Sequence, residues 1–187
     1  MILADVEIKK LVEEQGMIEG FIDHQVKEID GKKAISYGLS SHGYDVRLAD
    51  TLKIFRGREG EVFDPKNPKD PHFMLVKGRD VIEVPAYSHV LGYSVERFKI
   101  PRNIMCLVEG KSTYARSGLF CNVTPLEAGW EGQITLEFFN SLSVPVKMYL
   151  NEGCCQVLFF NGEHCEVSYA DRGGKYQGQM GITLSKV

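Results

Sequence analysis

Several features are missing from this 187-residue sequence, and each absence excludes a class of protein. No apolar run approaches the roughly 18 residues that a membrane-spanning helix needs. The first residues, MILADVEIKK, show no basic region followed by an apolar stretch, which is the mark of a signal peptide. The 22 basic residues are outnumbered by 25 acidic ones, which argues against a basic nucleic-acid-binding module. We therefore expect a cytoplasmic protein without membrane or nucleic-acid partners.

Regularly spaced cysteine pairs are also missing. The cysteines are odd in number and irregular in spacing, with no CxxC: Cys106, Cys121, Cys154, Cys155 and Cys165. This argues against a disulfide framework or a four-thiolate zinc site. His164-Cys165-Glu166 matches the H-x-E half of a zinc deaminase signature, but the P-C-x-x-C half is absent because no cysteine follows Cys165. We expect reduced, buried thiols, no zinc, and a surface position for His164.

Helical periodicity is clear only near the start of the chain. Apolar residues follow one another there at i, i+3 and i+4 spacing: Ile8, Leu11 and Val12. Asp5 can cap the first turn, and Gly16 can take the left-handed conformation that ends a helix. The pattern predicts one short amphipathic helix at about residues 5–15.

The rest of the chain consists of short apolar runs rich in β-branched and aromatic residues. They are Leu52–Phe55, Val81–Val84, His89–Val95, Ile104–Val108, Ile134–Phe139, Val146–Leu150 and Val157–Phe160. Beyond Pro85, glycine or proline often interrupts them about every 8 to 12 residues, which is typical of a β-sandwich or barrel. The polar segment 57–72, with three prolines, is a long excursion from this pattern. We expect a mainly β protein with a single domain over residues 1–187.

The segment 110–119, GKSTYARSGL, has the composition of a phosphate-binding turn. Lys111, Ser112, Thr113 and Arg116 supply positive charge and hydrogen-bond donors, and the flanking glycines let the backbone bend. The GxxxxGK[ST] order of a P-loop is absent. A solvated polar turn between two strands is the alternative, and by composition alone it is the favoured interpretation because such turns are common.

Glu137 interrupts the most apolar strand of the sequence. Alternation places Ile134, Leu136 and Phe138 on one face of residues 133–140, and Glu137 on the other face between Thr135 and Phe139. A carboxylate in such a strand is costly unless it is paired or neutralised. Desolvation would raise its pKa into the range used in general acid–base catalysis. A glutamate on a solvated sheet face, or one paired with arginine, is the alternative interpretation.

The tail at residues 173–181, GGKYQGQMG, combines hinges with polar donors. Three glycines, a lysine, a tyrosine and two glutamines fall within seven residues. Such a tail can close over a bound ligand, whereas a frayed terminus is the alternative. The alternating run Ile182-Thr183-Leu184 just beyond it argues against fraying.

Four segments together resemble the dCTP deaminase family of the dUTPase-like superfamily. They are SYGLSSHGYDVRL (36–48), IPRNIMCLVEGKSTYARSGL (100–119), NVTPLEAGWEGQITLEFFN (122–140) and GGKYQGQMGITL (173–184). The resemblance covers nearly the whole chain. It implies a distorted β jelly roll, or β-clip, of the dUTPase-like type, assembled as a homotrimer with active sites between subunits. It also implies zinc-independent hydrolysis of dCTP to dUTP and ammonia, a step that supplies dUMP and dTTP synthesis, with dTTP as a candidate inhibitor.

The family motifs also imply roles for individual residues. Glu137 would be the general acid–base, supported by Ser112 and Arg116. Mg²⁺ would accompany the triphosphate, since hard phosphate oxygens favour it. The tail, at about 169–187, would contribute to nucleotide binding. Residues implied to hold the nucleotide are Lys111, Ser112, Thr113, Tyr114, Ala115, Arg116, Thr135, Leu136, Glu137, Gln156, Tyr169, Lys175 and Gln179.

One turn departs from the family pattern and keeps alternatives open. Many members carry I-D-P-G before an aromatic residue, where this chain has Leu126-Glu127-Ala128-Gly129-Trp130. Glu127 is one methylene longer than the usual Asp. Trp130 and the short approach to it resemble members that only deaminate, rather than bifunctional members that also hydrolyse dUTP to dUMP. A bifunctional deaminase, a dUTPase and a non-catalytic nucleotide-binding module remain the alternative functions.

Overall fold

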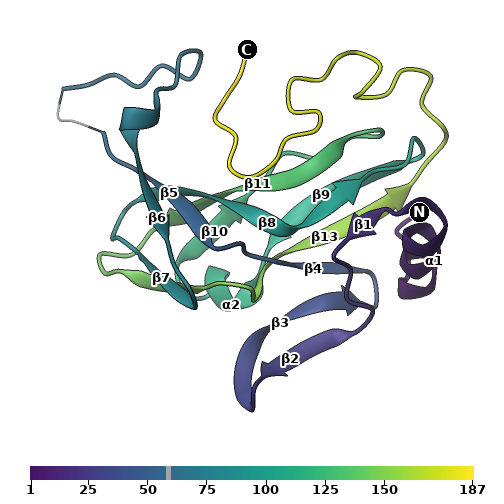
Figure 1. Ribbon diagram of the computed structural model, residues 1–187, viewed down its shortest axis with the longest axis horizontal. Coiled ribbons are helices and arrows are strands. Elements are labelled where there is room, and N and C mark those ends of the chain that lie inside the picture. Colours follow the sequence, from purple (N-terminus) through teal and green to yellow (C-terminus); the bar gives the residue numbers. More distant parts are fainter. Residues whose placement is uncertain (58–59) are drawn as a thin grey trace.

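The computed structural model describes residues 1–57 and 60–187, which form a mainly β structure as expected (Figure 1). The helices are α1 (Asp5–Gln15), the single turn α2 (Ser112–Ala115) and a 3₁₀ turn at Asp70–His72. The strands are β1 (Ile18–Glu19), β2 (Gln25–Ile29), β3 (Lys32–Ser40), β4 (Gly43–Arg47), β5 (Thr51–Phe55), β6 (Phe73–Lys77), β7 (Val81–Val84), β8 (His89–Lys99), β9 (Ile104–Gly110), β10 (Leu119–Asn122), β11 (Glu131–Asn140), β12 (Val146–Tyr149) and β13 (Gly153–Asn161).

The strands pair in antiparallel fashion into two larger sheets and a small one. One sheet has the order β10-β11-β8-β5-β6, with β1 also paired to β8. The other has the order β2-β3-β4-β13-β9, and β12 pairs with β7. Neighbours in these sheets are often far apart in sequence, as β4 and β13 are. This arrangement is the distorted jelly roll that the sequence predicts.

The core lies where the inner faces of the two larger sheets meet. Each sheet contributes a fully buried aromatic side chain from a central strand, such as Phe138 of β11 and Phe159 of β13. Tyr44 of β4 and Phe98 of β8 are equally buried. The buried positions of β11 alternate along the strand, so its outer face, which carries Glu137, is turned away from the core.

Helix α1 has the predicted bounds but a different cap. Ile8 is fully buried, and Gly16 takes the left-handed conformation with φ of 64° and donates its N–H to Val12 O at 2.9 Å. The predicted cap at Asp5 is wrong. Ala4 is the capping residue, and its backbone N–H donates to Glu7 Oε2 at 3.0 Å. The Asp5 carboxylate accepts the adjacent N–H of Val6 instead, at 2.8 Å.

Each predicted apolar run lies in a strand, whereas several polar strands escaped prediction. The hairpin of β2 and β3 is mostly exposed or half-buried and extends away from the sheets in Figure 1. It has little of the apolar pattern that burial imposes. In the predicted excursion, residues 58 and 59 lie outside the described residues, and the run Phe73–Lys77 just after it forms β6. The tail beyond Gly181 is not a strand.

The cysteines are free thiols. Cys106, Cys154 and Cys155 are buried as predicted, while Cys121 and Cys165 are half-buried. Burial raises the pKa of the Cys106 thiol well above its usual value, which makes this thiol unreactive. Among the described residues no helix is long and apolar enough to span a membrane.

Candidate active site

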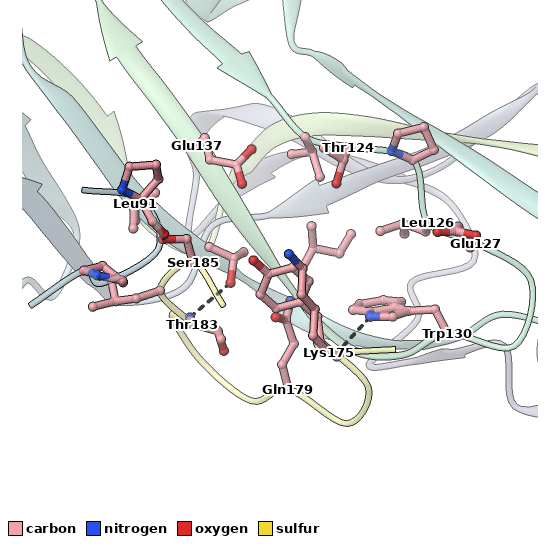
Figure 2. A pocket seen from close by; sticks show the side chains of 18 of the residues that line it. Leu91, Thr124, Leu126, Glu127, Trp130, Glu137, Lys175, Gln179, Thr183 and Ser185 are labelled. Atoms are coloured by element: carbon pink, nitrogen blue, oxygen red, sulfur yellow. Dashed lines mark hydrogen bonds between the residues drawn. The ribbon is translucent and has the colours of Figure 1, made fainter. Parts of the chain in front are cut away.

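A cavity of about 1090 Å³ lies against the outer face of β11. Its walls come from the turn that follows β10, from strands β8 and β11, and from the C-terminal tail. The tail runs along one side of the sheets in Figure 1, and Figure 2 shows its residues Thr183 and Ser185 across the pocket from Thr124. Clefts of this size hold small-molecule ligands.

Glu137 points into this cavity from the middle of β11 (Figure 2). The strand is paired on both sides, with Asn122 of β10 and Leu91 of β8 opposite Glu137. Its Oε2 atom is buried and has no hydrogen-bond partner among the described residues. Desolvation by burial raises the pKa of Glu137 to about 7. The carboxyl is therefore poised to gain or lose a proton near neutral pH.

The tail is docked onto the turn before β11. Trp130 Nε1 donates to Tyr176 O at 3.1 Å, and the Tyr176 N–H donates to the Tyr169 hydroxyl at 3.0 Å. Only glycine fits at position 174, because a Cβ there would lie 2.0 Å from the Tyr169 ring. Gly174 thus serves close packing, which the composition alone does not reveal, whereas Gly173, Gly178 and Gly181 have positive φ and open space around them.

The tail continues along β11 and reaches the excursion after β5. Gln179 Nε2 donates to Gln133 O at 2.8 Å, and the Thr183 N–H donates to Thr135 Oγ1 at 3.2 Å. The Ser185 hydroxyl donates to Pro65 O at 2.7 Å. The excursion therefore forms one wall of the cavity, which sequence reasoning missed.

The predicted site residues fall into two separate groups. The first, called the cavity cluster, lines the cavity and comprises Thr135, Glu137, Tyr169, Lys175 and Gln179. The second, called the α2 cluster, is not among the lining residues and comprises Lys111, Ser112, Thr113, Ala115, Arg116 and Gln156. In Figure 1, α2 and the C-terminal tail lie on opposite sides of the sheets. One chain does not bring the two clusters together.

Two of the predicted residues have side chains that are unavailable to a ligand. Leu136 is on the core face of β11 and is fully buried. Tyr114 is 4 % exposed, and its hydroxyl accepts the Tyr149 N–H at 2.9 Å. A side-chain contact from either residue is therefore excluded here, and only their main-chain atoms are left for the predicted role.

Comparisons with known proteins show the family of this chain. A family model described as dCTP deaminase-like matches residues 2–162. The dCTP deaminase of Cupriavidus metallidurans is 52% identical, and that of Francisella tularensis subsp. novicida 54%, each over 99% of this chain and 98% of the relative. This chain belongs to the dCTP deaminase-like family.

A solved structure supports the fold of this dCTP deaminase-like protein. The crystal structure of 2'-deoxycytidine 5'-triphosphate deaminase from Agrobacterium tumefaciens superposes with a TM-score of 0.64 at 17% identity. The match covers 86% of this chain and 48% of that chain. The similarity establishes a shared fold.

The turn that departs from the family pattern forms part of the rim of the cavity. Glu127 lines the cavity and forms an ion pair with Arg172, whose guanidinium lies 5.3 Å from the centre of the Tyr169 ring. The sequence did not indicate a role for Arg172, because nothing near it in the sequence shows that it pairs with Glu127, 45 residues earlier. In this dCTP deaminase-like chain the longer carboxylate is thus committed to an ion pair.

The described residues offer no arrangement that would hold a metal ion by itself. No group of three or more His, Cys, Asp or Glu side chains converges among them. His164, from the partial zinc signature, is exposed.

Proposed function

We propose that the protein is a dCTP deaminase, which hydrolyses dCTP to dUTP and ammonia. The observation that carries the proposal is the buried, unpaired Oε2 atom of Glu137 in a cavity large enough for a nucleotide. The family membership and the names of the relatives support the choice of substrate. We also propose that the enzyme works on free nucleotides and that it does so in the cytoplasm.

Glu137 supplies the proton transfers of this reaction. Water attacks C4 of cytosine, and the ionised carboxylate accepts a proton from that water as the C–O bond forms. The carboxyl returns that proton to N3, and the carboxylate so formed then takes the remaining proton of the C4 hydroxyl and passes it to the amine, which leaves as ammonia when the C4–N bond breaks and the C4 carbonyl forms. A pKa near 7 suits both directions of transfer, because neither form of the carboxyl is strongly favoured. Zinc has no step in this scheme.

The two clusters meet when chains associate as a homotrimer. Lys175 is the cation of the cavity cluster, whereas a triphosphate carries several negative charges that need further cations. Arg116 of the α2 cluster is exposed and forms no ion pair with any described residue. From a neighbouring chain it can reach the ligand and stabilise the charged form of Glu137, while Ser112 orients the water.

An exposed apolar pair next to α2 supports this assembly. Phe120 of β10 and Phe139 of β11 are directly opposite one another, and they are 53 % and 45 % exposed. Leu142 and Val144 are also exposed in the segment that follows β11. An apolar surface of this kind is typical of a subunit interface.

The triphosphate binds with Mg²⁺, and the tail controls access to the cavity. Magnesium normally binds nucleotides through phosphate oxygens and waters. The C-terminal segment from Gly173 closes over the nucleotide, and dTTP competes for the same site as an inhibitor. Chelation of zinc is expected to leave activity intact when Mg²⁺ is present.

The first experiment assays the products of dCTP and Mg²⁺. Ammonia and dUTP in equal amounts would support deamination alone. Pyrophosphate and dUMP would indicate the bifunctional enzyme, and release of pyrophosphate from dUTP without ammonia would indicate a dUTPase. Nucleotide binding without any turnover would leave only the binding module.

A mixing experiment tests the shared site. Glu137→Gln and Arg116→Gln are each expected to be inactive, and mixing them under subunit exchange should restore activity because some sites combine an intact Glu137 with an intact Arg116. The matched control mixes Glu137→Gln with the double variant, which cannot restore any site. Failure of the first mixture to regain activity, or a fully active monomer in light scattering, would contradict the trimeric site.

A further inference from the structure

The ammonium group of Lys111 is occupied within the chain. Its Nζ atom lies 2.8 Å from Asp45 Oδ2, and the two side chains are only 12 % and 8 % exposed. Asp45 belongs to β4, in the segment 36–48, to which sequence analysis assigned no role for individual residues. A buried ion pair of this kind is costly to break, because either partner alone leaves a desolvated charge.

Helix α2 needs anchors of this kind. It has four residues, and the capping residue Lys111 makes no capping hydrogen bond with its side chain. A single helical turn is unstable by itself because its nucleus fixes several residues for one or two hydrogen bonds. Tertiary contacts hold it: the Lys111–Asp45 ion pair and the hydrogen bond from the Lys111 N–H to Cys154 O (3.4 Å) at its start, and the buried Tyr114 side chain two residues into the turn.

Gln156, the distant member of the α2 cluster, is held by the same segment. Its Nε2 atom donates to Ser40 Oγ at 3.1 Å, and the Ser40 hydroxyl donates to Gly43 O at 3.1 Å. In the sheet, Gln156 of β13 is directly opposite Asp45 of β4. The hairpin of β3 and β4 therefore contacts both parts of the α2 cluster, Lys111 through Asp45 and Gln156 through Ser40.

We propose that Asp45 and Ser40 are positioning residues that fix the α2 cluster in its binding geometry, and that the Lys111 ammonium is structural and does not bind phosphate. This inference rests on the proposed function, since it assigns roles within that nucleotide site. Arg116, which is exposed and whose guanidinium pairs with no described residue, is the cation of the cluster that faces the ligand.

Substitution of Asp45 distinguishes a structural Lys111 from a phosphate-binding Lys111, because the two roles predict different changes in the affinity for dCTP. If Asp45 positions the cluster, Asp45→Asn and Lys111→Met each raise the Kd and KM for dCTP by about tenfold or more, because small displacements of a binding group are costly. The double variant is then no worse than the poorer single variant. Lys111→Arg, which keeps the ion pair, retains affinity close to that of the wild type.

The opposite result is equally clear. If the ammonium binds phosphate, Asp45→Asn frees it and removes a competing negative charge, so dCTP binds as tightly as before or more tightly while Lys111→Met alone loses affinity. That outcome overturns the proposal. Glu14→Gln is the matched control, because it removes a carboxylate from the exposed Lys10–Glu14 pair on α1 and should change neither constant.

A measurement without nucleotide keeps the inference separate from the proposed function. The N–H groups of Ala115 and Arg116 donate to Lys111 O and Ser112 O, each at 3.0 Å, so their hydrogen exchange reports whether α2 is formed. Asp45→Asn should speed this exchange at least about tenfold, whereas Glu14→Gln should not. Unchanged exchange overturns the positioning role, even if the wild type fails to release ammonia from dCTP.

The proposal can still be tested if one of the single variants fails to fold. The double variant Asp45→Asn/Lys111→Met removes both buried charges and so leaves neither unpaired. It should fold, with faster exchange in α2 and weaker dCTP binding. If it folds, protects α2 and binds dCTP like the wild type, the ion pair has no positioning role.

Discussion

Glu96 and Glu137 lie in the same sheet, on the adjacent strands β8 and β11, yet Glu96 is fully buried whereas Glu137 is half-buried with a buried Oε2 atom. The Glu96 side chain is 0 % exposed, and its carboxylate accepts hydrogen bonds from the Arg47 backbone at 3.0 Å, from Arg47 Nε at 2.7 Å and from the Tyr44 hydroxyl at 3.2 Å. Glu137 Oε2 has no partner among the described residues and faces the cavity.

The difference separates a carboxylate that stabilises the fold from one that is available for chemistry. Burial raises the pKa of Glu96, but the Arg47 guanidinium and the hydrogen bonds oppose that rise and keep the group tied to β4. Within one chain nothing opposes the desolvation of Glu137, and its pKa reaches about 7. A buried polar group without a partner lowers the stability of the fold. Such a group therefore calls for an explanation, and a role in catalysis is one.

The largest expected effect is on catalysis. Glu137→Gln keeps the shape of the side chain and loses the base, so turnover of dCTP should fall by about 10²–10⁴-fold, as expected for loss of general acid–base catalysis. Binding of dCTP should survive, which gives a fall in kcat with little change in Kd. Glu137→Asp should also be poor, because retraction by one methylene misplaces the water. Near-normal ammonia release from Glu137→Gln would contradict the assignment of Glu137 as the general acid–base and make Glu127 the next candidate.

The corresponding change at the other carboxylate should affect the fold. Arg47→Met leaves Glu96 buried without its ion-pair partner, and the free energy of unfolding should fall by about 3–5 kcal/mol. Urea titration followed by circular dichroism measures it. The exposed pair Arg97–Glu19 is the control, because Glu19→Gln should change stability by less than about 1 kcal/mol. Equal losses for the two variants would mean that the Glu96 network is not a stabilising contact.

The pH dependence of activity sharpens the comparison. Glu137 must be ionised to accept a proton, and its pKa is raised to about 7. The value of kcat/KM should therefore fall about tenfold for each pH unit below roughly 7. Binding of dUTP across the same range separates this effect from titration of the triphosphate. An inflection near 4.5 would show that the cavity does not desolvate the carboxyl.

The smallest expected effect is on stability as a function of pH. The folded-state pKa of Glu137 lies above its value of 4.5 in the unfolded chain, so the native state binds more protons between about pH 4.5 and 7. Stability should therefore fall as pH rises through that window. Glu137→Gln lacks this penalty and should raise Tm by several degrees at pH 8 and hardly at all at pH 4. If Glu137→Gln has a lower Tm than the wild type at pH 8, the Glu137 carboxylate is not destabilising and the expectation is wrong.

Much of the fold follows from local patterns in the sequence. The alternation over residues 133–140 places Glu137 opposite the core face of β11, and the spacing of Ile8, Leu11 and Val12 predicts the bounds of α1. The polar hairpin Gln25–Ser40 escaped prediction because its exposed strands have no apolar alternation to recognise.

The candidate site was predictable only in part. The family motifs name residues of β11 and of the tail that line one cavity, the cavity cluster. The same motifs cannot show that the α2 cluster lies apart from them, or that Tyr114 and Leu136 turn their side chains into the core. Those facts depend on how strands far apart in the sequence pair.

The sequence by itself determined which residue types occupy the strands and turns, because side-chain alternation and turn chemistry act over a few neighbouring residues. It placed a carboxylate on the outer face of an apolar strand and glycines in the tail. Only the tertiary structure decided that this carboxylate is desolvated while Glu96 is paired, and that Lys111 is bound to Asp45. The physical reason is that solvation and partners are set by whichever segments pack against a side chain, and here those segments come from distant parts of the chain.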